Sequence, residues 1–196
     1  MNKTPAKGWY SRGYLPHFDN RSRTQFITYR LADSLPQRIL RGLRSRLERE
    51  KITDRELLIK IDKYLDKGLG ECHLGKPEIA IMVEENLLHF DGKKYKLHSW
   101  VIMPNHVHLL LTPKDRYSLS EITHSAKSYS SSKANKILKR EARFWFPEVF
   151  DRYIRDDEHF EKTWKYIELN PVTAGLCKHP YDGRFSSAWW RKNRGG

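Results

Sequence analysis

The sequence predicts one domain in which amphipathic helices pack with β-strands. At 196 residues the chain is long enough for one substantial core. Two apolar runs rich in β-branched and aromatic residues flank Pro104-Asn105, which is typical of a strand, a turn and a second strand. Over several longer segments the apolar residues recur at helical spacing instead. A fold that mixes the two kinds of element is therefore expected.

The first third of the chain is expected to be an arm, a strand and two helices. Residues 1 to about 23 predict a basic aromatic arm without regular structure, because Lys, Arg, Trp and Tyr alternate there with Gly, Pro, Asn and Ser. The β-forming run 24–31 predicts the first strand. Apolar stripes predict helices over about 36–51 and 54–66.

The rest of the chain is expected to alternate between helices and strands. A helix over about 76–89 leads through the tight turn Asp91-Gly92 into a strand over 95–102, and the second strand begins at His106. A helix is predicted from Leu119 to about Leu138. Residues 144–156 predict a connector, and the last helix begins near Asp156 and stops at Asn170 because Pro171 follows. Residues 186–192 form an aromatic and basic patch.

The charge balance indicates a polyanionic partner. Lys and Arg outnumber Asp and Glu by 37 to 24, a formal net charge of +13, and 12% of the residues are aromatic and suited to stacking on bases. We therefore expect nucleic acid as the partner. No apolar run approaches the ~20 residues that a membrane span requires. With two cysteines and no apolar signal region, a cytoplasmic, nucleoid-associated protein is expected.

The pattern His106-Val107-His108 places two imidazoles on one face of a strand, because side chains alternate along it. The apolar residues Leu109 to Leu111 continue this strand and indicate that it lies inside a sheet. Polar rings on a core strand are costly unless satisfied, and a divalent metal would satisfy both. The alternative is structural, with one histidine capping the Pro-Asn turn and the other packing under a loop.

A second pair of side chains lies on the last predicted helix. Tyr166 and Asn170 are four residues apart, so they share one helix face. Imidazole nitrogens and an amide oxygen can hold a divalent ion, which polarises a phosphate. A tyrosine beside them can attack phosphorus and form a covalent protein–nucleic-acid intermediate.

These motifs resemble a known family. Met103-Pro104-Asn105-His106-Val107-His108, together with Tyr166-Ile167-Glu168-Leu169-Asn170-Pro171-Val172-Thr173-Ala174-Gly175, is similar to the REP-associated tyrosine transposases, a branch of the single-tyrosine HUH transposases. The resemblance implies an α+β fold of the ferredoxin-like HUH endonuclease type, with helices packed on a central antiparallel sheet that carries the histidines. It also implies cleavage of single-stranded or hairpin DNA through a 5′-phosphotyrosine, with Mg²⁺ or Mn²⁺.

The resemblance assigns roles to individual residues. It implies that His106 and His108 are metal ligands, that Tyr166 is the nucleophile and that Asn170 is the third ligand. Tyr129 is a rival nucleophile without a partner amide. Five basic residues are candidate DNA contacts: Arg12, Lys127, Lys133, Arg152 and Arg155.

The resemblance is expected to extend over the whole chain, 1–196, as one domain. The segment of about 34–70 is larger than a minimal catalytic core needs, so we interpret it as a helical insertion for DNA binding or for packing. Related transposases include dimers that share sites, and the sequence leaves a monomer and a homodimer, and cis and trans action of Tyr166, equally open.

Two other functions remain alternatives to a transposase. One is a domesticated nucleic-acid-binding protein that keeps the fold without turnover. The other is a hydrolytic metallonuclease in which Tyr166 only packs. Trapping of covalently bound DNA distinguishes the transposase from both.

Overall fold

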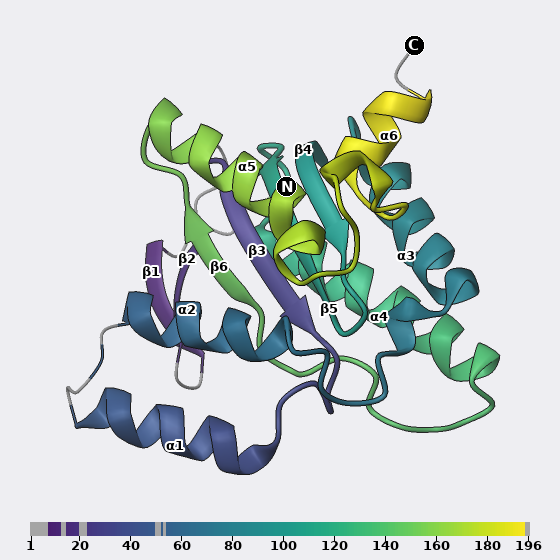
Figure 1. Cartoon of the computed structure of the whole chain (residues 1–196). Coiled ribbons are helices and arrows are strands. Elements are labelled where there is room, and N and C mark those ends of the chain that lie inside the picture. Colours follow the sequence, from purple (N-terminus) through teal and green to yellow (C-terminus); the bar gives the residue numbers. More distant parts are fainter. Residues whose placement is uncertain (1–7, 13–14, 20–22, 50–51, 53, 195–196) are drawn as a thin grey trace.

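The computed structural model describes residues 8–12, 15–19, 23–49, 52 and 54–194, which form an α+β fold (Figure 1). The strands are β1 (Gly8–Arg12), β2 (Leu15–Asp19), β3 (Gln25–Arg30), β4 (Tyr95–Ile102), β5 (His106–Pro113) and β6 (Phe150–Tyr153). The α-helices are α1 (Gln37–Glu48), α2 (Asp54–Leu65), α3 (Pro77–Phe90), α4 (Leu119–Ile137), α5 (Asp157–Thr173) and α6 (Ser187–Arg194). Two short 3-10 helices are η1 (His73–Gly75) and η2 (Pro180–Asp182).

The central sheet has the strand order β4-β5-β3-β6, and all its neighbours are antiparallel. β5 lies between β4 and β3, so the strand that carries the histidine pair is internal, as its apolar run predicts. His108 is paired with Thr28 on one side and with Val101 on the other. The expected α+β class with a central antiparallel sheet is confirmed.

Helices cover both faces of this sheet (Figure 1). α3 and α4 pack on one face, where Val107 and Leu109 of β5 join the largest apolar cluster. α5 packs on the opposite face, where Ile167 joins Phe26 and Leu110. His106 and His108 alternate with Val107 and Leu109, so the histidines point toward the face that α5 covers.

α1 and α2 form a helical pair with a small core of its own, and α2 lies between α1 and the sheet (Figure 1). Leu57, Ile61 and Leu65 on α2 are buried against Leu35 and Leu43. This spacing of three to four residues is the apolar stripe predicted for the helix. The buried stripe fixes which side of α2 packs against α1.

The N-terminal arm differs from the sequence expectation. β1 and β2 pair antiparallel, with Trp9 opposite Phe18, so an irregular arm was the wrong prediction for 8–12 and 15–19. The Gly and Pro residues in the arm favoured an irregular segment. The β-forming residues of the two stretches nevertheless pair with one another. The strand predicted as the first is therefore β3. The other residues of the arm lie outside the described ranges.

Two predictions near the C-terminus are also corrected. Residues 150–153, expected in a connector, form β6 along the edge of β3. The aromatic and basic patch, for which no secondary structure was predicted, lies on the helix α6. α5 does not stop at Asn170 but continues through Pro171 to Thr173. Proline lacks only its own N–H, and near a helix end the following turn still closes, because Ala174 N donates to Asn170 O. Asn170 therefore stays in helical register with Tyr166.

A buried carboxylate on α3 provides a test of this packing. Arg184 donates from Nη1 and Nη2 to the two carboxylate oxygens of Glu84 at 2.9 and 3.2 Å, and the Glu84 side chain is 4% exposed. Arg184→Ala is expected to lower the free energy of unfolding by about 2–3 kcal/mol, because a buried charge loses its partner. Lys162→Ala breaks an exposed pair with Glu158 and is expected to cost less than about 0.5 kcal/mol. Equal losses for the two variants in urea denaturation would contradict this account.

Candidate active site

The two histidines of β5 form the centre of the site. His106 and His108 are fully buried, and their Nε2 atoms lie 3.0 Å apart. Burial lowers the pKa of His108 to about 3. Burial, and then the charge of His108, holds the pKa of His106 well below its usual range. Both rings are therefore neutral near pH 7, the form in which imidazole ligates a metal.

Each ring is held in place through its other nitrogen. Asn105 Oδ1 lies 2.7 Å from His106 Nδ1, and Thr28 Oγ1 lies 2.7 Å from His108 Nδ1. Asn105 Nδ2 donates to the carbonyls of Leu65 and Leu69 at 3.1 and 3.0 Å, so the amide oxygen must face His106. An oxygen acceptor there requires the proton of His106 on Nδ1, which leaves Nε2 with a free lone pair. This orientation of a histidine by a hydrogen-bond partner is typical of metal ligands.

α5 brings Tyr166 and Asn170 to the same place. The Tyr166 ring lies edge-on to His108 and to Phe26, with ring centroids at 5.5 and 5.9 Å. Tyr166 is 38% exposed, whereas Asn170 is 2% exposed and its buried Oδ1 has no hydrogen-bond partner. The shared face predicted from their spacing is thus turned toward the histidines. Tyr166 lies beside the histidine pair of its own chain.

α2 contributes two carboxylates that the sequence analysis missed. Tyr166 Oη donates a hydrogen bond of 3.0 Å to Asp62 Oδ2. Asp66 Oδ1 lies 4.0 Å from His106 Nε2 and is buried without a hydrogen-bond partner. The only signal in the sequence was the spacing of Asp62 and Asp66, four residues apart beside the apolar stripe. Such a pair on a helix is usually solvated, so it pointed to no site.

Burial also sets the charge state of these carboxyls. It raises the pKa of Asp62 to about 7, and the hydrogen bond from Tyr166 opposes this rise. Burial raises the pKa of Asp66, while the neighbouring amide of Asn170 lowers it. Burial and then the charges of Asp62 and Asp66 raise the pKa of Tyr166. The tyrosine is therefore a neutral phenol at pH 7, and its hydroxyl already donates a hydrogen bond to a carboxylate.

The side chains gathered here can supply ligands for a divalent ion, and one of these ligands is an amide oxygen. In the described part of the chain, no three His, Cys, Asp or Glu side chains form a metal-binding group. Two imidazole Nε2 atoms 3.0 Å apart nevertheless match neighbouring ligands, because bonds of about 2.1 Å at right angles separate their ends by about 3.0 Å. The unpartnered oxygens of Asn170 and Asp66 are the hard donors that Mg²⁺ and Mn²⁺ prefer.

The other predicted residues lie apart from this centre. Tyr129 is exposed on α4, which packs on the opposite face of the sheet from the histidines. Lys133 is exposed on α4, and its ammonium lies 5.8 Å from the centre of the Tyr129 ring. Arg152 is half-buried on β6, and Arg155 is exposed just before α5. Arg12 ends β1, and its side chain lies outside the described set.

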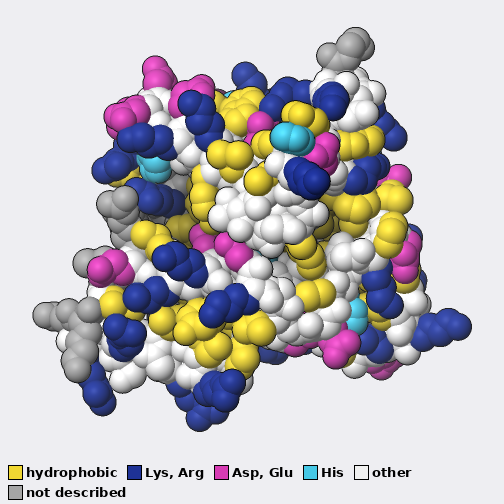
Figure 2. Space-filling view, in the orientation of Figure 1, with side chains coloured by type: hydrophobic (Ala, Val, Ile, Leu, Met, Phe, Trp, Pro, Cys, Tyr) yellow, Lys and Arg dark blue, Asp and Glu magenta, His cyan; other side chains and the backbone are white. Residues whose placement is uncertain are grey.

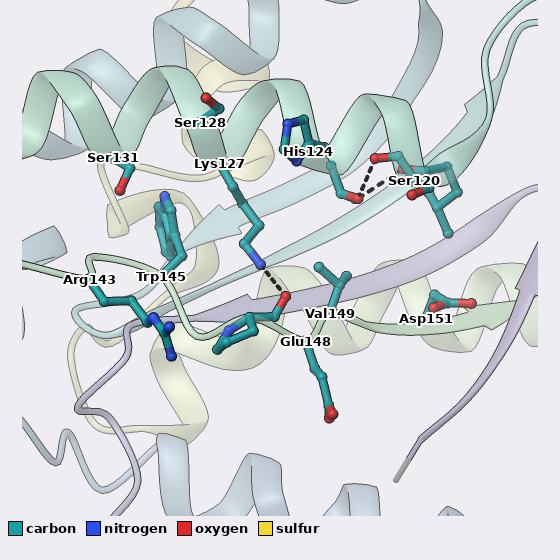
Figure 3. A pocket seen from close by; sticks show the side chains of 13 residues that line it. Ser120, His124, Lys127, Ser128, Ser131, Arg143, Trp145, Glu148, Val149 and Asp151 are labelled. Atoms are coloured by element: carbon teal, nitrogen blue, oxygen red, sulfur yellow. Dashed lines mark hydrogen bonds between the residues drawn. The ribbon is translucent and has the colours of Figure 1, made fainter. Parts of the chain in front are cut away.

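A cavity of about 960 Å³ lies between α4 and residues 143–151, away from the histidine pair (Figure 3). Lys127 extends from α4 into it and donates to the carbonyls of Phe146 and Pro147 at 2.7 and 2.8 Å. Its ammonium thus stabilises the segment that precedes β6. Glu148 and Asp151 also line the cavity, so its charge is mixed.

Residues 82–170 match the family model described as "Transposase IS200 like", and this range contains His106, His108, Tyr166 and Asn170. No curated protein sequence matches the chain. No helix among the described residues is long and apolar enough to cross a membrane.

Solved structures give a likeness in fold. The chain is similar to a REP-associated tyrosine transposase bound to a REP hairpin, with a TM-score of 0.53, 19% identity and coverage of 95% of this chain and 86% of that one. A candidate transposase from Deinococcus radiodurans has a TM-score of 0.34 and 13% identity, over 82% of this chain and 96% of that one. The family match and the shared fold confirm the resemblance that the two motifs indicated.

Removal of the Asn105 side chain tests the support of the histidines. Asn105→Ala is expected to lower the free energy of unfolding by about 3 kcal/mol, since it leaves the buried Nδ1 of His106 without a partner and removes one hydrogen bond from each of the carbonyls of Leu65 and Leu69. Thr28→Val, which removes one partner at nearly constant volume, is expected to cost about 1–2 kcal/mol. Chemical denaturation of both variants checks the order, and a Thr28 loss as large as that of Asn105 would contradict it.

The partial burial of Lys127 predicts a pH dependence of stability. Burial, and then the charge of Arg30, lowers the Lys127 pKa to about 8 from an unfolded value of 10.5. Between pH 8 and 10.5 the unfolded state therefore binds more protons at this residue, so its contribution to stability rises with pH. Urea denaturation from pH 8 to 10 is expected to give a smaller upward slope for Lys127→Met than for the wild type. Lys133→Met, on the exposed face of α4, is the charge-matched control and is expected to keep the wild-type slope.

Proposed function

Because residues 82–170 match the IS200-like transposase family model, we propose that this protein is a metal-dependent single-stranded DNA strand transferase with a covalent tyrosine intermediate. The observation that carries the proposal is the position of the Tyr166 ring, 5.5 Å from the ring of His108. Tyr166 is also the accessible member of the group, with 38% of its surface exposed, while both histidines are buried. A nucleophile at the surface above buried ligands is the arrangement that a DNA phosphate needs.

The proposed metal, Mg²⁺ or Mn²⁺, is held by His106, His108 and Asn170. The support is the buried, unpartnered Oδ1 of Asn170 and the two neutral imidazoles with adjacent Nε2 atoms. Asp66, whose unpartnered Oδ1 lies 4.0 Å from His106, is available as a further oxygen ligand. A bound divalent ion supplies polarisation of the phosphate and charge stabilisation on its oxygens. To occupy the site it must replace the contact between the two Nε2 atoms.

In the proposed reaction the Tyr166 Oη attacks a DNA phosphorus and the 3′ oxygen leaves. The product is a 5′-phosphotyrosine and a free 3′-hydroxyl, so the bond energy is retained for rejoining. His108 and Phe26 hold the ring by edge contacts, which restricts the direction of attack. Retention of the phosphodiester energy is what distinguishes strand transfer from hydrolysis.

Single-stranded or hairpin DNA is the proposed substrate. The similar solved structure is bound to a REP hairpin, and the net charge of this chain is +13. On the face shown in Figure 2, Lys and Arg side chains gather to the left of and below the acidic side chains at the centre of the view. Arg155, exposed just before α5, and Arg152 on the neighbouring β6 are the candidate phosphate contacts nearest in the chain to the nucleophile helix.

Loss of the tyrosine hydroxyl is the direct test of this function. Tyr166→Phe is expected to abolish the covalent protein–DNA adduct and to leave DNA binding within a few-fold, because only the hydroxyl is removed. Wild type and variant are incubated with labelled single-stranded DNA from beside the gene and Mn²⁺, and are then separated on denaturing gels.

Tyr129→Phe is the matched control for this test, since it removes an exposed hydroxyl on the other face of the sheet. It is expected to keep the adduct. Cleavage without any adduct would indicate a hydrolytic nuclease, and an adduct that survives in Tyr166→Phe would overturn the assignment of the nucleophile.

Metal dependence is tested by binding as well as by activity. The double variant His106→Ala/His108→Ala is expected to lose Mn²⁺ binding, measured by electron paramagnetic resonance, and to form no adduct. Excess EDTA is expected to stop adduct formation by the wild type. Adduct formation that continues in EDTA would refute the proposed metal site but would be compatible with the tyrosine mechanism.

A further inference from the structure

The hydroxyl of Tyr166 points at a carboxylate that comes from a distant part of the chain. Tyr166 Oη donates to Asp62 Oδ2 at 3.0 Å, and the two residues are 104 positions apart. Asp62 lies on α2, outside the segment 82–170 that matches the transposase family. We propose that Asp62 is a catalytic residue that accepts the proton of Tyr166 when its oxygen attacks DNA. This inference rests on the proposed function and adds the group that activates its nucleophile.

The position of Asp62 follows from the packing of α2. Ile61 and Leu65, which flank it on the helix, are buried in the small core that α1 and α2 share. Asn105 Nδ2 donates to the Leu65 carbonyl, which ties the end of α2 to the strand turn before His106. The helix that carries Asp62 is thus fixed by packing on one side and by a hydrogen bond at its end.

The proton balance is simple. The Oη–H bond breaks and its proton passes to Asp62, which becomes a carboxylic acid, while the oxygen's electron pair forms the Oη–P bond. The P–O3′ bond breaks, and the departing 3′ oxygen takes a proton from water. During rejoining the 3′-hydroxyl gives its proton to hydroxide and its oxygen attacks phosphorus, the Oη–P bond breaks, and Asp62 returns the proton to the departing phenolate oxygen. One acceptor therefore serves both directions.

The surroundings make Asp62 a stronger base than an exposed carboxylate. Burial raises its pKa to about 7, and the charge of Asp66 on the same helix adds to this rise. The hydrogen bond from Tyr166 on α5 acts in the opposite direction. Transfer of the proton leaves the charge of the pair unchanged, so no second anion is created beside Asp66.

The first experiment compares Asp62→Asn with the wild type. The amide keeps the shape and a hydrogen-bonding oxygen but cannot take the proton. Adduct formation on gene-flanking single-stranded DNA with Mn²⁺ is expected to slow about 100-fold or more at pH 7. Glu56→Gln is the matched control, because it neutralises an exposed carboxylate on the same helix, and its rate is expected to stay within about two-fold of the wild type. Mn²⁺ binding by Asp62→Asn is expected to match the wild type.

Three further readouts separate proton transfer from positioning. Formate is expected to restore part of the rate of Asp62→Ala, because it can enter the space left by the side chain. A sulfur in place of the bridging 3′ oxygen, a better leaving group, is expected not to rescue Asp62→Asn, since the loss lies at the nucleophile. The wild-type rate is expected to rise with pH and level off once the carboxyl is ionised, while the Asp62→Asn rate continues to rise.

The outcomes distinguish the proposed role of Asp62 from the proposed function of the protein. Absence of an adduct from the wild type would overturn the proposed function and this inference together. A wild-type adduct with an unchanged rate in Asp62→Asn would overturn the inference alone. A slow Asp62→Asn that the sulfur leaving group rescues, or an Asp62→Ala that formate leaves inactive, would also reject proton transfer by Asp62.

Discussion

The arrangement of the site depends on the hydrogen bonds of one buried amide, that of Asn105. Its Nδ2 donates to the carbonyls of Leu65 and Leu69, near the end of α2, and its Oδ1 faces His106 Nδ1. The same side chain thereby fixes the tautomer of a candidate metal ligand and secures the helix that carries two carboxylates. A buried amide satisfied on both sides admits one orientation, so the histidine strand and α2 are held in one relative position.

The central sheet separates the site from the bulk of the apolar core. Val107 and Leu109 pack under α3 and α4, while the alternating histidines face α5. The continuation of α5 through Pro171 keeps Asn170 one turn beyond Tyr166 and buried. One face of β5 thus packs in the apolar core, and the other face carries the histidines. The packed face holds the strand rigid, so the two buried imidazoles stay in place.

Much of this could be predicted from the sequence, because the relevant signals are local. Alternation along 106–113 placed both histidines on one face, and the spacing of Tyr166 and Asn170 placed them on one helix face. The hairpin in the arm, the edge strand β6 and the last turn of α5 were mispredicted. In the first two cases pairing with another strand outweighed the local preference of Gly, Pro or a charged residue. In α5 the turn after Pro171 closes within the helix, because Ala174 N donates to Asn170 O.

The sequence by itself determined which residue types face together along each strand and helix, and hence the histidine pair, the tyrosine and the amide. Only the tertiary structure decided that these meet, and that α2 adds Asp62 and Asp66. The physical reason is the separation in sequence of the residues that interact. Periodicity reports neighbours within a turn or two, whereas the contact between Tyr166 and Asp62 depends on how α2 packs against α1 and on the carbonyls that Asn105 binds.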